Sequence, residues 1–259
     1  MDTNTDTSAT VADAAFFSSL KEETHFYIVR HGQSEGNAKG LFQGRLDLPL
    51  EKAGREQART AGAWLAAQGV RVVVSSPLAR AAQTAGIVAE ACGIEPSFDG
   101  LFREIDTGIF TGLGYKECRE RYPDVFEDFE GRSWEAVPGA ERAEALYGRA
   151  MRSWTLLSER AKSGCAKIAC VSHGGFIQWL VRSTFGCRSW MPLLSTANCG
   201  IFELLVEPTR SGSPYLQWRY INYQAPAAAS SSPGAPPATS PAWPIPSLPS
   251  MKADHSGSD

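Results

Sequence analysis

Long uninterrupted hydrophobic runs are missing from this 259-residue sequence. A helix that spans a bilayer needs about 20 consecutive apolar residues, and no stretch approaches that length. The first residues, Met1-Asp2-Thr3-Asn4-Thr5-Asp6, carry no basic cluster, although a secretory signal peptide begins with one. We therefore expect no membrane span, no binding to a membrane and no signal peptide.

An excess of positive charge is missing as well. Lys and Arg total 25 against 28 Asp and Glu, which gives a formal net charge of −3 at pH 7. Proteins that bind nucleic acids generally are basic, so we expect no nucleic-acid partner. Any anion site in this chain must be local and built from a few arginines.

Cysteine is sparse and unpaired. The six cysteines form no Cys-x-x-Cys motif, and no spacing of cysteine and histidine fits a zinc site. A chain of this length needs no disulfides, and scattered thiols are typical of a reducing cytosol. We therefore expect a cytoplasmic protein without a metal. The cysteines are Cys92, Cys118, Cys165, Cys170, Cys187 and Cys199.

Composition divides the chain into three parts. Residues 1–23 are rich in Thr, Ser, Ala and Asp, and residues 225–259 hold eight of the sixteen prolines together with Ala, Ser and Gly. Neither part can bury a core, so both are predicted to be disordered, and residues 24–224 are the predicted folded domain. In the tail, Pro246-Ser247-Leu248-Pro249 matches a Pro-x-x-P ligand, but chance is the more common origin of this motif in such a composition.

Short apolar runs alternate with helical patterns inside the folded part. Continuous β-branched runs bounded by turns are typical of strands buried in a parallel sheet. Strands that alternate with helices predict an α/β fold, a mostly parallel sheet with helices on both faces. Residues 113–150, rich in aromatic and charged side chains, are a predicted small helical cap insertion. Strands are expected at 26–29, 70–74, 167–171, 200–206 and 215–222, with a short one within 94–112, and helices at about 51–68, 77–92, 140–161 and after residue 175.

Three of the predicted strands end in turns that carry basic side chains. Arg30 and His31 follow the first strand, Arg80 follows the second, and His173 follows the strand at 167–171. Ligands of open α/β sheets bind beyond the carboxyl ends of the strands, and helix N-termini favour anions. A guanidinium can hold an anion through two parallel hydrogen bonds, and a neutral imidazole can act as a nucleophile. The pattern predicts a site where a phosphate is held and its phosphorus is attacked.

Each of these residues also has a more ordinary interpretation. Arg80 lies in the first turn of a helix whose expected N-cap is Ser76 and whose expected first residue is Pro77, and most arginines in such turns are solvated. His173, taken alone, is typical of a hydrogen-bonded turn residue. Their joint placement at strand ends favours the phosphate site.

The first of these turns resembles the opening signature of a known family. Arg30-His31-Gly32-Gln33-Ser34, followed by Asn37, is similar to the start of the histidine phosphatase superfamily, the phosphoglycerate-mutase-like proteins. The resemblance covers about residues 25–222, and several motifs in the right order make it specific. The further matching motifs are Phe42-Gln43-Gly44, Ser75-Ser76-Pro77-Leu78-Ala79-Arg80, Arg103-Glu104-Ile105, Pro138-Gly139-Ala140-Glu141 and Val171-Ser172-His173-Gly174-Gly175.

This resemblance implies a metal-independent phosphomonoester hydrolase that works through a phosphohistidine. His31 would attack the phosphorus, and Glu104 would protonate the leaving oxygen and then help a water molecule attack. No cofactor is implied, and the expected partner is a small phosphorylated metabolite whose identity the sequence does not give. The residues that the resemblance assigns are His31, Glu104 and His173 as catalytic residues, Arg30, Arg80, His173 and Asn37 as phosphate ligands, and Gln43 and Gly44 as substrate contacts.

Three alternatives stay open. A cofactor-dependent phosphoglycerate mutase would carry a longer insertion with paired arginines, and the stretch after Gly112 lacks an Arg-Arg pair, which favours the phosphatase branch. Gly32-Gln33-Ser34-Glu35-Gly36 matches the nucleophile elbow of a serine hydrolase, with Ser34 as nucleophile and His173 as base, but further glycines follow it in place of a helix. A non-catalytic phosphate-binding module is the third alternative, and the presence of a nucleophile, a clamp and a proton donor opposes it.

Overall fold

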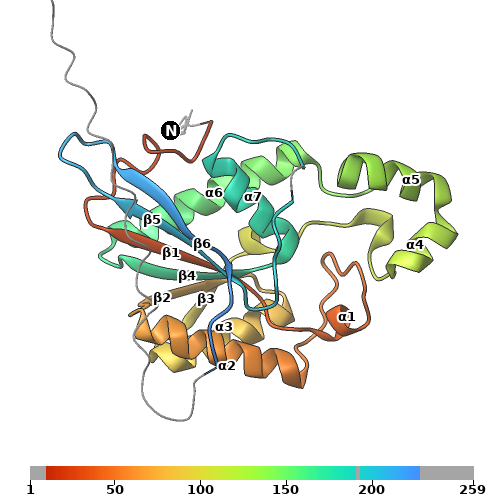
Figure 1. Cartoon of the computed structure of the whole chain (residues 1–259), viewed down its shortest axis with the longest axis horizontal. Helices are drawn as coiled ribbons and strands as arrows, with labels where there is room; N and C mark the ends of the chain where they lie inside the picture. The colour runs from red at the N-terminus through yellow and green to blue at the C-terminus, as the bar shows by residue number, and fades with distance from the viewer. Residues whose placement is uncertain (1–9, 191–192, 228–259) are drawn as a thin grey trace, which may run out of the picture. The chain divides into compact units, whose positions relative to one another are not determined.

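A six-stranded mixed sheet forms the centre of the fold, with the strand order β3-β2-β4-β1-β5-β6 (Figure 1). The computed structural model describes residues 10–190 and 193–227. Strands β1 to β4 pair in parallel, whereas β5 runs antiparallel to β1 and β6 antiparallel to β5. The mostly parallel sheet is therefore confirmed. The strands are β1 Thr24–Arg30, β2 Val72–Ser75, β3 Pro96–Phe98, β4 Lys167–Ser172, β5 Ile201–Glu207 and β6 Tyr215–Tyr223.

Helices cover both faces of this sheet, as expected (Figure 1). Successive residues of a strand point to opposite faces, and β1 shows the consequence. Phe26 and Ile28 belong to a buried cluster with residues of α6 and α7, while Tyr27 and Val29 belong to a second cluster with residues of α2 and α3. Because both faces of the strand are buried, its sequence is apolar at successive positions and does not alternate with polar residues. The helices that cover the sheet are α2 Lys52–Ala67, α3 Ala79–Cys92, α6 Ala143–Lys162 and α7 Gly174–Thr184, and the short helix α1 Glu35–Ala38 lies away from the sheet (Figure 1).

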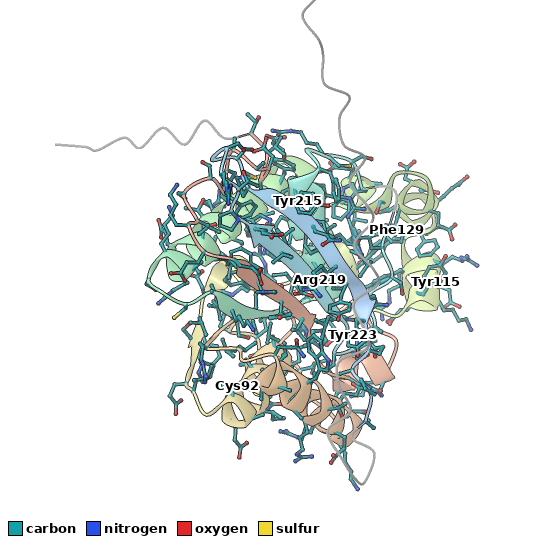
Figure 2. All side chains as sticks on the ribbon, turned by 60° about the vertical axis from the view of Figure 1, so that its left-hand side comes forward. Cys92, Tyr115, Phe129, Tyr215, Arg219 and Tyr223 are labelled. Carbon is teal, nitrogen blue, oxygen red and sulfur yellow. The ribbon has the colours of Figure 1, made fainter. Side chains whose placement is uncertain are left out.

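The cap insertion is built from two short helices, α4 (Tyr115–Arg121) and α5 (Pro123–Arg132). Tyr115 on α4 and Phe129 on α5 lie in the same region of the molecule (Figure 2). The insertion has an apolar cluster of its own around the buried Phe110 and Phe126. Helix α6, which overlaps the end of the predicted cap at 113–150, packs instead into the cluster against the sheet, so the insertion ends before residue 143.

The expectation of disorder for residues 1–23 is wrong for the part that the structure describes. Phe17 is fully buried, and its ring centroid lies 5.9 Å from that of Phe26 and 5.6 Å from that of Trp154. The amide of Ala12 donates to the carbonyl of Ser183 at 2.9 Å. A few apolar side chains within a polar segment are thus enough to attach it to the domain. Residues 1–9 lie outside the described residues, as do residues 228–259, which include most of the predicted tail and its Pro-x-x-P motif.

Two further features bear on the sequence expectations. All six cysteines are free thiols. Within residues 10–190 and 193–227, the helices are too short or too polar to cross a membrane.

Candidate active site

The residues predicted to carry the chemistry meet at the carboxyl ends of the parallel strands. One cavity of about 320 Å³ is lined by seven of the eight predicted site residues. The eighth, His173, does not line the cavity but lies directly beside it, fully buried, with its ring centroid 5.1 Å from that of His31. The seven lining residues are Arg30, His31, Asn37, Gln43, Gly44, Arg80 and Glu104.

His31 is held in one tautomer. Its Nδ1 lies 2.7 Å from the carbonyl oxygen of Gly32, and since a carbonyl can only accept a hydrogen bond, Nδ1 carries the hydrogen. Burial, and then the guanidinium groups of Arg80 and Arg30, hold the pKa of His31 well below its ordinary value of 6.5. The ring is therefore neutral, and Nε2 presents a lone pair at the cavity, as a nucleophile must.

Arg80 contacts that same nitrogen. Its Nε donates to Nε2 of His31 at 3.3 Å, and its two terminal nitrogens donate to the carbonyls of Leu46 at 2.6 Å and Gly44 at 2.8 Å. Only 1% of the Arg80 residue is exposed, so this guanidinium is a fixed charge and not a solvated one. The solvated interpretation of Arg80 is thus wrong.

The helix that carries Arg80 begins later than expected. Ser76 was the expected N-cap and Pro77 the expected first residue, but α3 begins at Ala79 with the extended residue Leu78 as its N-cap. Ser76 forms a tertiary contact instead, because its Oγ lies 2.8 Å from Nε2 of His173. The amide of Ala79 donates to the carboxylate of Asp47 at 2.5 Å, which satisfies one N–H of the first turn.

The guanidinium of Arg30 has one nitrogen with a hydrogen-bond partner and one nitrogen without a partner. One of its terminal nitrogens donates to the carbonyl of Thr196, whereas its Nε is buried and has no hydrogen-bond partner. Gly174 makes room for this side chain, since a Cβ at that position would lie 3.3 Å from Nε of Arg30 and 2.8 Å from Oγ1 of Thr196. The first glycine after His173 is therefore a packing requirement of the site.

His173 also has a buried nitrogen without a partner, Nδ1. Burial, and then the charge of Arg80, lower the pKa of His173 well below 6.5, so the ring is neutral. Oγ of Ser76 accepts the amide of Leu78 at 3.2 Å, which leaves its own hydrogen free to donate to Nε2. With Ser76 as the donor, the ring hydrogen lies on Nδ1. Buried donors normally have acceptors, so Nε of Arg30 and, in this tautomer, Nδ1 of His173 are donors that an oxyanion could satisfy.

Glu104 is held at the N-terminus of α7. Its carboxylate accepts hydrogen bonds from the amides of Gly175 at 3.1 Å and Phe176 at 2.9 Å, and from Ile105 at 2.9 Å. A Cβ at position 175 would lie 2.6 Å from its Oε1, so the second glycine allows this approach. The carboxylate therefore lies at the cavity through backbone contacts and not through the neighbouring Arg103.

Asn37 and Gln43 are linked through Ser34. The Ser34 side chain caps α1, and Oδ1 of Asn37 and Oε1 of Gln43 lie 3.1 Å and 2.9 Å from its Oγ. Ser34 is fully buried, and the histidine that a serine hydrolase would require, His173, pairs with Ser76 instead. This geometry opposes Ser34 as a nucleophile.

Several residues of the site carry no signal in the sequence. Asn198 donates through Nδ2 to the carbonyl of His31 at 3.1 Å and to Oδ1 of Asn37 at 3.2 Å. It lies outside every motif, and the pairing of β5 with β1 brings this part of the chain to the site. Trp134 and Trp190, which form part of the apolar wall of the cavity, also lie outside every motif.

Within residues 10–190 and 193–227, no three or more His, Cys, Asp or Glu side chains are grouped so that they could hold a metal ion. The positive charge at this site comes from the guanidinium groups of Arg30 and Arg80.

Comparison with known proteins agrees with this geometry. Residues 26–217 match the family model of the histidine phosphatase superfamily (branch 1). A protein of Salmonella paratyphi A named "Probable phosphoglycerate mutase GpmB" is 31% identical over 185 residues, which are 69% of this chain and 83% of that protein.

Solved structures with the same fold include two phosphatases. A mycobacterial glucosyl-3-phosphoglycerate phosphatase, solved with VO3, is 26% identical with a TM-score of 0.66, over 77% of this chain and 99% of that one. The alpha-ribazole phosphatase of Shigella flexneri is 21% identical with a TM-score of 0.65, over 80% and 100% of the two chains. The second likeness concerns the fold alone.

Proposed function

The chain belongs to the histidine phosphatase superfamily, and from this premise we propose that it is a metal-independent phosphomonoester hydrolase that acts through a phosphohistidine on a small phosphorylated metabolite. The observation that carries the proposal is the state of His31. A neutral ring with its hydrogen on Nδ1 leaves a lone pair on Nε2 at the cavity wall. This nitrogen accepts a hydrogen bond from the buried guanidinium of Arg80, and the partly buried guanidinium of Arg30 lines the same cavity.

The proposed reaction has two displacements. In the first, Nε2 of His31 attacks the phosphorus, the bond to the ester oxygen breaks, and Glu104 gives its proton to the leaving alkoxide. In the second, a water molecule attacks the phosphohistidine, gives a proton to Glu104, and the P–N bond breaks to release phosphate. Each displacement proceeds in line.

Arg30, Arg80 and His173 are proposed to hold the three oxygens that lie around the phosphorus during transfer. Preorganised donors in a site that excludes water stabilise such charge strongly. Nε of Arg30 and Nδ1 of His173, which have no protein acceptor, support this assignment. The arginine charges make a metal ion unnecessary for this chemistry. The free thiols of the chain suit a reducing, cytoplasmic location.

A phosphoenzyme trap tests the proposal. The protein would be mixed with a radiolabelled aryl phosphate and quenched, and we expect an acid-labile, base-stable label on residue 31. His31→Ala should lose both the label and turnover, whereas Ser34→Ala should keep the label. Normal turnover by His31→Ala would exclude the mechanism, and label on Ser34 would indicate a serine hydrolase. Binding of phosphate without any label would indicate a non-catalytic module.

Phosphoglycerate mutase activity is the second candidate, because the relatives that are about 30% identical carry that name. In a mutase the phosphohistidine passes its phosphoryl group to a second hydroxyl and not to water. Interconversion of phosphoglycerates that depends on a bisphosphate primer would support the mutase. Release of inorganic phosphate without a primer would support the phosphatase.

A further inference from the structure

The cavity has two chemically different ends. Arg30, Arg80 and Glu104 lie at the end where phosphate is proposed to bind. The rest of the lining carries uncharged polar side chains, such as Thr107, Gln178 and Thr196, together with a group of apolar ones. These apolar side chains come from the loop after α1, the cap, and the segment between α7 and β5. The apolar residues that matter here are Leu41, Phe42, Trp134, Trp190, Leu193 and Leu194.

The aromatic part of this wall is held in place by other rings. The ring of Trp134 lies 5.3 Å from Phe42 at an interplanar angle of 90° and 4.8 Å from Phe129. Trp190 packs edge-on against Trp179 at 4.8 Å, and its Nε1 lies 3.3 Å from the carboxylate of Glu135. These side chains therefore present a preformed apolar surface, as in many ligand sites.

Leu193 adds exposed apolar surface to the same cavity. It is 57% exposed, and it lines the cavity together with Leu194. An apolar group bound beside the phosphate would remove part of this surface from water, which is favourable roughly in proportion to the area covered.

The described lining residues hold no cation beyond those that the proposed reaction uses. Among the described lining residues, the charged side chains are Arg30, Arg80 and Glu104, which the proposed reaction already uses. Arg45, next along the chain from the lining residue Gly44, is paired with Asp106 at 3.5 Å and Glu141 at 3.2 Å. A carboxylate on the substrate would lose its hydration against apolar surface without gaining a cation, which is costly.

We propose that the substrate is the phosphate monoester of an uncharged, largely apolar or aromatic alcohol, and not of a carboxylate-bearing glycerate. This inference rests on the proposed phosphatase function and specifies its leaving group. Specificity of this kind combines attraction for the apolar group with rejection of the charged one.

Binding of two matched phosphonates tests the inference independently of turnover. 4-Isopropylbenzylphosphonate and 4-carboxybenzylphosphonate have similar shape, cannot be hydrolysed, and differ in one charge. Titration calorimetry on the full chain should give a Kd at least about tenfold lower for the isopropyl compound, the range that a hydrophobic pocket achieves. Equal or tighter binding of the carboxy compound, or binding of neither, would overturn the inference.

A pair of variants tests whether the apolar wall of the cavity causes the preference for the isopropyl compound. Leu193→Arg places a cation at the apolar end. It should reduce the ratio of the Kd of the carboxy compound to the Kd of the isopropyl compound by about tenfold, or bring it below one. Ile221→Arg is the control, because Ile221 is 48% exposed on β6 and does not line the cavity, and it should keep the wild-type ratio. An unchanged ratio in Leu193→Arg, or an equal change in both variants, would contradict the assignment.

Hydrolysis is measured on the same preparation to separate the two claims. Phenyl phosphates with the same two substituents should be cleaved with label on His31, the isopropyl compound at the higher kcat/KM. Cleavage without a preference for the isopropyl compound overturns the leaving-group assignment and leaves the phosphatase intact. A clear Kd preference without cleavage supports the apolar pocket and rejects the phosphatase.

Discussion

The Nε of Arg80 donates a hydrogen bond to Nε2 of His31 across 3.3 Å, although the two residues lie 49 positions apart in the chain. One residue follows strand β1 and the other lies in the first turn of α3. This contact ties the proposed nucleophile to the proposed clamp. A phosphate bound as we propose would take up hydrogen bonds from a guanidinium that the protein has already oriented.

Replacing Arg80 by Lys should lower kcat/KM by roughly 10²–10³, the typical loss when one preorganised donor to the transition state is removed. Lysine keeps the charge but cannot contact His31, Gly44 and Leu46 at once. Steady-state kinetics on an aryl phosphate checks this. Arg59→Lys is the control, since Arg59 lies exposed on α2 in an ion pair with Glu56. Equal activity of both variants would show that Arg80 does not act on the phosphate.

The two buried histidines should make the protein less stable as the pH falls below about 6.5. The pKa values of His31 and His173 are lowered in the folded protein, so below 6.5 the unfolded chain binds protons that the folded chain does not. Each histidine should remove about 1.4 kcal/mol per pH unit from the free energy of unfolding. Well above pH 6.5 the two histidines are neutral in both the folded and the unfolded chain, so their contribution to the free energy of unfolding no longer changes with pH.

Urea unfolding at pH 7.5 and pH 5.5 measures this effect, with an expected loss of about 2–3 kcal/mol from the two histidines together. The variant His31→Gln should lose about half as much between the two pH values. Wild type and variant with the same pH dependence would show that His31 titrates normally in the folded protein.

Replacing Gly175 by Ala should impair leaving-group protonation. The new Cβ would lie 2.6 Å from Oε1 of Glu104 and displace the carboxylate. Acid catalysis is worth about 10²–10⁴ in rate, so kcat for an alkyl phosphate should fall far more than kcat for 4-nitrophenyl phosphate, whose leaving group needs no proton. Gly86→Ala in α3 is the control. Its Cβ would have no neighbour within 4 Å, so activity should persist, and a small gain in stability is expected.

Asn198 should act as a positioning residue for the nucleophile. Asn198→Ala removes the hydrogen bonds to the carbonyl of His31 and to Asn37, and kcat should fall by roughly tenfold, within the loss of about 10² that a 1 Å misplacement can cause. Asn198→Asp should be worse, because a carboxylate would face two acceptor oxygens. Stopped-flow measurement of phosphoenzyme formation checks both variants. An Asp variant as active as wild type would exclude this role.

Phe17 should contribute to stability although it precedes the first strand. Phe17→Ala removes a fully buried ring between Phe26 and Trp154, and such changes cost about 3–5 kcal/mol. Phe98→Ala is the control, since Phe98 is 51% exposed on the edge strand β3, and it should cost much less. Urea denaturation measures both. Equal stability of the two variants would mean that the segment around Phe17 does not belong to the folded domain.

By itself the sequence determined the layered architecture and most members of the site. Continuous β-branched runs such as that in β2 indicate double burial, and Arg30, His31, Arg80 and His173 all follow strands or start helices that the local pattern identifies. Parallel strands with helices between them must bring their carboxyl ends to one edge. The convergence of these residues was therefore predictable from local order alone.

Tertiary structure alone decided what each of these groups contacts. The tautomer of His31 depends on the carbonyl of Gly32, and Ser76 pairs with His173 instead of capping a helix. Phe17 is buried in the core although the segment around it is polar in composition. Asn198 and Trp134 reach the site from distant segments that no motif marks. Such contacts depend on which surfaces meet after folding. Local propensity and periodicity predict where strands and helices lie, but not which side-chain atoms of distant elements come into contact.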